Sequence, residues 1–179
     1  LRMDCCGQYG PIVLKRNVIE VGTNDWAVYL NQYDQGQPVS EIEGNTIINQ
    51  NGPGLYFVGA RSGLLFSSNV VSSSDTGLRL YPPGGSVQVV GTHFTGLNYG
   101  PAVSIWNVQA EGGQPSMTTN LSVSENVVDG SWSTGIYVSA NNQGITFSLS
   151  SNTVTGANNG VELFDVQGVV VQENVLTSN

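Results

Sequence analysis

The chain has 179 residues, enough for one domain with a shared core, and only 10% of them are charged, with a formal net charge of −8. Five basic residues cannot neutralise a run of phosphates, so nucleic acid is excluded as a partner. No apolar run approaches the roughly 20 residues that cross a bilayer. The 23 glycines and the frequent Val and Ile favour short strands joined by many turns.

The first residues read as a strand already in progress. The chain begins with Leu1 rather than Met and shows no basic-then-apolar secretion signal, so we expect a mature or excised segment of a longer protein. The adjacent cysteines, Cys5 and Cys6, leave two interpretations open. They are free or paired with other chain, or they form a strained vicinal disulfide or an intermolecular crosslink.

One short template recurs seven times along the chain: apolar, any, apolar, any, any, Asn, any, apolar. Its clearest copy spans residues 63–71, where Leu64, Phe66 and Val71 are the apolar positions and Asn69 is the polar one. Among all seven copies only Ser40 replaces an apolar residue. The residues at the Asn position are Asn17, Asn45, Asn69, Thr92, Asn126, Asn152 and Asn174.

A further strand with alternating apolar residues completes each repeat. It usually follows a Gly or Pro turn, as Leu78 and Leu80 follow the turn at residues 75–77. Three short strands per repeat, each too small to bury its apolar face alone, are typical of a solenoid. We therefore expect one all-β domain over residues 1–179, with about seven rungs stacked about 4.8 Å apart.

The Asn position predicts a stacked corner. Asn tolerates left-handed backbone, and its amide can bond the amide of the neighbouring rung, so both properties favour Asn at a tight bend. Thr92 should break this ladder locally.

These corners resemble a known family. The sequences Gly44-Asn45-Thr46-Ile47, Ser68-Asn69-Val70-Val71 and Ser151-Asn152-Thr153-Val154 are similar to the right-handed parallel β-helix of pectate-lyase-like proteins. The resemblance covers practically the whole chain and implies the fold. That superfamily includes polysaccharide lyases and hydrolases, phage tailspikes, adhesins and noncatalytic surface proteins, so enzymatic and structural roles both stay open.

One outward face is rich in aromatic residues. The candidate substrate-binding residues on it are Tyr29, Tyr56, Arg79, Tyr81, Trp106, Tyr137 and Phe164. Planar rings can stack on sugars, and the resemblance implies that glycans lie on the comparable face. Alternatively, the rings stabilise the sheet or are covered by other chain. The long excursion at residues 106–120 makes this face the default site.

Three residues are candidates for catalysis. Asp25 and Asp75 lie two rungs apart, about 10 Å, which is at the upper edge of the spacing of inverting glycosidases, although both occupy ordinary turn contexts. Arg79 could imitate the arginine base of a pectate lyase. No cofactor or metal is expected; Ca²⁺ stays open as an alternative that the sequence does not support, because no acidic cluster accompanies Arg79. The motifs expected of a polygalacturonase-like protein are absent.

Two further residues complete the predictions. His93 should be a solvated outward residue, and Asn120 begins a glycosylation sequon. The preferred hypothesis is a noncatalytic structural segment of a secreted surface or fibre protein that contacts a polysaccharide through its aromatic face. Its open, uncapped ends leave two interpretations: a slice of a longer β-helix with association through flanking chain, or copies that stack end to end. The alternative is a polysaccharide-active enzyme, a lyase or glycoside hydrolase, that uses Asp25, Asp75 and Arg79.

Overall fold

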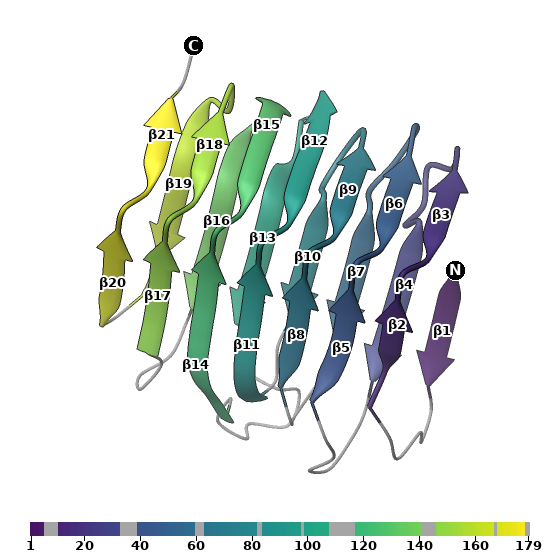
Figure 1. Ribbon diagram of the computed structural model, residues 1–179, viewed down its shortest axis with the longest axis horizontal. Coiled ribbons are helices and arrows are strands. Elements are labelled where there is room, and N and C mark those ends of the chain that lie inside the picture. The colour runs from purple at the N-terminus through teal and green to yellow at the C-terminus, as the bar shows by residue number, and fades with distance from the viewer. Residues whose placement is uncertain are drawn as a thin grey trace.

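The computed structural model describes residues 1–5, 11–32, 39–59, 63–81, 84–97, 99–107, 117–140, 146–166 and 168–177. These residues form a parallel β-solenoid with no helix among them, in which three sheets of seven strands run along its length and form its sides (Figure 1). Every rung contributes one strand to each sheet. The predicted all-β solenoid with three short strands per rung is therefore confirmed.

The strands of each sheet pair in parallel, in chain order along the solenoid. Sheet A contains β1 (Arg2–Cys5), β4 (Val28–Gln32), β7 (Leu55–Val58), β10 (Leu78–Tyr81), β13 (Pro101–Asn107), β16 (Thr134–Ala140) and β19 (Asn159–Phe164). Sheet B contains β2 (Val13–Lys15), β5 (Ser40–Glu43), β8 (Leu64–Ser67), β11 (Gly84–Val90), β14 (Met117–Ser124), β17 (Thr146–Ser150) and β20 (Val169–Gln172). Sheet C contains β3 (Val18–Val21), β6 (Thr46–Asn49), β9 (Val70–Ser73), β12 (His93–Leu97), β15 (Val127–Ser131), β18 (Thr153–Thr155) and β21 (Val175–Thr177).

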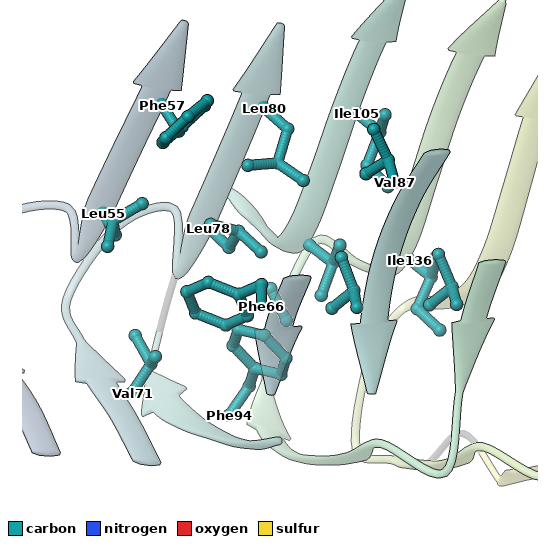
Figure 2. Close-up of a cluster of buried hydrophobic side chains, with 14 of the residues drawn as sticks. Leu55, Phe57, Phe66, Val71, Leu78, Leu80, Val87, Phe94, Ile105 and Ile136 are labelled. Carbon is teal, nitrogen blue, oxygen red and sulfur yellow. The ribbon is translucent and has the colours of Figure 1, made fainter. Parts of the chain in front are cut away.

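The core is a set of apolar ladders that run along the inside of the solenoid. Alternate residues of each strand point inward, so Leu78 and Leu80 of β10 are fully buried between sheets (Figure 2). The rings of Phe66 and Phe94 pack in this core with their centroids 6.4 Å apart. Ser40, the polar exception, is also buried, and its hydroxyl accepts the Ile12 N–H at 3.0 Å, so its polarity is satisfied.

A hydrogen-bond ladder links the corners between sheets B and C. The backbone N–H of Asn45 donates to Asn69 Oδ1 at 2.9 Å, and Asn45 Nδ2 donates to the same oxygen and to the backbone carbonyl of Leu14. The Asn126 corner repeats this pattern with Asn152 and Val89. The Asn45 and Asn126 side chains each satisfy a corner N–H and a strand carbonyl of the preceding rung and also bond the side chain of the next corner, which confirms the predicted ladder.

Thr92 weakens the ladder as expected. Its hydroxyl oxygen lies 3.3 Å from the Asn69 N–H and its own N–H donates to Asn126 Oδ1, so the backbone part of the ladder continues. The hydroxyl also donates to the carbonyl of Val90 in its own rung. No side-chain bond from Asn69 Nδ2 to position 92 is formed, because the hydroxyl replaces the amide.

The expectation that the corner Asn itself takes left-handed backbone is wrong. The residue immediately before each corner has the positive φ, and the corner residue does not. We call these seven residues the corner ridge: Arg16, Gly44, Ser68, Gly91, Glu125, Ser151 and Glu173, with φ between 54° and 65°. The bend is made one residue early, which leaves the Asn amide free to bond along the solenoid.

We expect Thr92→Asn to stabilise the protein by about 1 kcal/mol, because Asn restores the side-chain bonds between three successive corners. Urea unfolding and the melting temperature measure the change. The matched control is Thr92→Val, which keeps the shape but removes the acceptor of the buried Asn69 N–H, and it should cost about 1–3 kcal/mol. Equal stability of the two variants would refute the role of the ladder.

The corner ridge predicts a second pair of changes. Glu125→Gly should raise stability by about 0.5 kcal/mol, because Gly adopts positive φ without steric cost. Gly44→Ala should lower stability by about 1 kcal/mol, because alanine is strained at positive φ. The new Cβ would lie 3.5 Å from Arg16 Cγ, an ordinary contact, so a steric clash does not contribute to the loss. As a control, Ser124→Gly in β14 should destabilise; a gain there as large as at Glu125 would contradict the assignment.

Candidate functional site

The outward face of sheet A aligns the predicted site residues in rows. One row of register partners runs Tyr29, Tyr56, Arg79, Ser104, Tyr137 and Glu162. Tyr81 lies beside Val58 of the preceding strand, and Trp106, Ser139 and Phe164 align further along the same face. Residues from six rungs therefore lie on one surface, because β4, β7, β10, β13, β16 and β19 pair in parallel register.

Four aromatic rings form a cluster over β4, β7 and β10. The rings of Tyr29 and Tyr56 are stacked, with their centroids 4.9 Å apart and their planes 5° apart. Trp26 and Tyr81 both tilt against Tyr56, at centroid distances of 5.1 Å and 5.5 Å. Because Tyr29 and Tyr56 each present a flat face to the other, part of the ring surface stabilises the sheet rather than facing solvent.

Arg79 joins this aromatic cluster. Its guanidinium carbon lies 5.5 Å from the centre of the Trp26 ring, within the range of a cation–π interaction. Nη2 lies 3.4 Å from Thr76 Oγ1, while the buried Nε finds no hydrogen-bond partner among the described residues. The Arg79 side chain is therefore held by an aromatic ring and retains an unused donor.

A second aromatic pair lies further along the face. The rings of Trp106 and Tyr137 have centroids 5.0 Å apart at an angle of 39°, and Trp106 Nε1 donates to Ser104 Oγ at 2.6 Å. This hydrogen bond and the ring contact fix the indole in one orientation. Phe164 in β19 is 60% exposed, whereas the other aromatic residues of this face are half-buried.

The two candidate acids occupy turns that lead into sheet A. Asp25 Oδ1 accepts the Trp26 N–H at 2.8 Å, and Asp75 Oδ1 lies 3.4 Å from Thr76 Oγ1. Both carboxylates therefore have local turn partners, as their sequence contexts predict. Arg79 contacts the residue that follows each acid, Trp26 and Thr76, and the Thr76 hydroxyl also lies beside Asp75.

The remaining candidates lie apart from this face. His93 is exposed in β12 of sheet C, where its register partners on the two neighbouring strands are Val70 and Val127. Asn120 of the sequon is exposed in β14 of sheet B. Cys6 and most of the predicted loop, residues 108–116, lie outside the described residues, as does the side chain of Cys5.

The described parts of the chain contain neither a metal-binding cluster nor a membrane-spanning helix. In those parts no group of three or more His, Cys, Asp or Glu side chains gathers to hold a metal ion. Across the same ranges, no helix has the length and apolar character that a membrane crossing requires.

Sequence reasoning missed Trp26 as a member of the face. It lies in the turn before β4, outside the strand alternation that identified the other rings, and it contacts Tyr56 and Arg79 of later rungs. Its place in the turn that leads into β4, directly after Asp25, could have predicted this position, because a large ring in such a turn can lie over the neighbouring strand.

The aromatic cluster predicts energetic coupling between Tyr29 and Tyr56. In a double-mutant cycle with Tyr29→Leu and Tyr56→Leu, we expect a coupling free energy of about 0.5–1.5 kcal/mol, the size of a stacked aromatic pair. Urea unfolding of the four proteins measures it. Tyr29→Leu with Tyr137→Leu is the control, since these residues lie four rungs apart and should be additive. A Tyr29–Tyr56 pair that is also additive would contradict the observed stacking.

Comparison with known proteins agrees with the architecture. No curated protein and no solved structure matches the chain. A family model described as a right-handed β-helix region matches residues 26–179, which is most of the chain and includes the whole aromatic face. The chain therefore belongs to the right-handed β-helix family.

Proposed function

We propose that this domain is a noncatalytic structural segment of an extracellular surface or fibre protein, and that its rungs continue by end-to-end stacking of copies. The proposal is carried by the exposure of apolar side chains in the two terminal rungs. Core-type side chains are half-exposed there: Leu1 at one end, and Val171 and Leu176 at the other, at 52%, 55% and 48%. Apolar side chains beside unpaired strand edges form a surface suited to another rung.

Electron microscopy and sedimentation velocity on residues 1–179 test this role. We expect association that grows with protein concentration and elongated particles that keep the width of one solenoid. Particles that stay monomeric up to hundreds of micromolar would overturn it. As a control, Leu97→Ser changes an exposed apolar residue outside the terminal rungs and should leave association unchanged.

Glycan contact through the aromatic face is the binding activity within this proposal. Trp106 and Tyr137 form a fixed pair, and Tyr81 lies at the margin of the aromatic cluster, so ring surface is presented at intervals along a flat sheet. The formal net charge of −8 disfavours polyanionic sugars, so we expect neutral polysaccharides to bind best.

Affinity electrophoresis in gels that contain neutral or acidic polysaccharides tests the glycan contact. Trp106→Ala should lower retardation by a neutral polysaccharide several-fold, whereas the control Leu97→Ala should retain it. Equal retardation of both variants, or none for the unaltered protein, would contradict glycan contact at this face.

One observation favours the alternative role as a polysaccharide lyase or glycoside hydrolase. Arg79 contacts the neighbours of both Asp25 and Asp75, and its buried Nε has no hydrogen-bond partner among the described residues. A reducing-end assay over neutral and acidic polysaccharides tests it. Activity that Asp25→Asn and Asp75→Asn each abolish would establish the enzyme, whereas activity that both variants retain would exclude these two acids.

A further inference from the structure

We infer that copies of this chain associate head to tail with the corner ladder in register, so that the acidic C-terminal rung of one copy docks on the N-terminal rung of the next, where Arg16 meets Glu173. This inference rests on the proposed end-to-end stacking and adds its polarity, its register and the charges that specify it. The two rungs, formed by β1–β3 and by β19–β21, lie at opposite ends of the solenoid (Figure 1).

The corner ladder has complementary ends. In every interior rung the corner N–H donates to the side-chain oxygen of the next corner along the chain. Among the described residues, Asn17 Oδ1 accepts no such bond, and the backbone N–H of Asn174 donates none. A second copy whose Asn17 follows Asn174 would continue the ladder, whereas two like ends would bring together two sets of donors or two sets of acceptors.

The same register aligns opposite charges. Three of the five basic residues of the chain lie in the N-terminal rung, Arg2, Lys15 and Arg16, beside two acidic ones, Asp4 and Glu20. The C-terminal rung carries Glu162, Asp165 and Glu173 and no basic residue. Charge complementarity of this kind favours opposite ends over like ends.

One charge pair is specified at the level of single residues. Arg16 and Glu173 are the first and last members of the corner ridge, and both are exposed. Neighbouring members of this ridge reach one another, since Ser151 Oγ lies 3.3 Å from Glu173 Oε2. In a stacked pair, Arg16 would therefore come within reach of Glu173 of the preceding copy.

Lys15 is already committed within its own copy. Its ammonium forms ion pairs with Glu41 and, at 3.1 Å, with Glu43. The hydrogen bond to Glu41, followed by that to Glu43, raises the pKa of Lys15 above its ordinary value of 10.5. Arg16 forms no ion pair within the described residues, so it is the basic side chain of this corner that remains available to a partner.

The apolar side chains of the two ends also match in register. If sheet C continued from β21 of one copy to β3 of the next, Leu176 would lie against Ile19. If sheet B continued from β20 to β2, Val171 would lie against Leu14. Successive inward residues pair in this way throughout the core. Outside the corner, Val175 and Val18, which are 55% and 75% exposed, would become neighbours. A second copy of this chain therefore fits the apolar, polar and charged features of both ends together.

Charge reversal at each end tests the register by sedimentation velocity at low ionic strength. Arg16→Glu and Glu173→Arg should each weaken association roughly tenfold, because like charges then meet. The double variant Arg16→Glu/Glu173→Arg should restore it. Glu125→Arg, the same change at an interior ridge position, is the matched control and should leave association as it was.

The single variants also test polarity, because like-end pairing brings equal charges together before and after either reversal and so predicts no loss of association. A head-to-tail interface predicts the loss in each single variant and restored association when the two are mixed, since each retains one native end. Association that occurs but ignores both reversals, or that the mixture does not restore, overturns this register while leaving end-to-end stacking intact. Absence of association in the unaltered chain overturns both, and circular dichroism on each variant separates loss of docking from loss of folding.

Discussion

The structure depends on how buried backbone groups are satisfied at a repeated tight bend. A buried N–H without an acceptor is costly, and a bend interrupts the sheet ladders that would supply one. Here the acceptor is the side-chain oxygen of the next corner, and the amide nitrogen of the same side chain returns to a carbonyl of the preceding rung. Each corner therefore requires its neighbours, so that a rung gains its stability from stacking rather than from itself.

This constraint also accounts for the strain beside each corner. Positive φ is unfavourable for most residues, yet five of the seven corner ridge residues carry side chains, including the charged Arg16, Glu125 and Glu173. The two to four hydrogen bonds that each interior corner donates are enough to offset about 1 kcal/mol of backbone strain. Because the ridge residues point outward from the corner, they are also free to vary in charge along the solenoid.

Much of the fold was predictable from the sequence, because period, alternation and Asn spacing are all properties of the chain order. The dihedral angles were not, because a corner at Asn69 is compatible with a left-handed Asn or a left-handed Ser68. Glycine, the residue that favours positive φ, occupies only two of the seven corner ridge positions, too few to separate the two possibilities. The rows of sheet A followed from strand alternation. The Trp26 contacts did not, since they join a turn to strands of later rungs and arise only when the rungs stack. Similarly, the contact of Arg79 with Trp26 spans two rungs and has no local signature.

The same repetition that builds the core links every rung to the next one through the corner ladder. If the corner ladder is the interaction that organises this architecture, its backbone amides should be among the last to open. Hydrogen exchange by NMR at the amides of Asn45, Asn126 and Asn152 tests this most directly. The account predicts exchange only through global unfolding, as slow as that of buried strand amides. Exchange as fast as that of exposed turn amides would show that the corners are not what holds the rungs together.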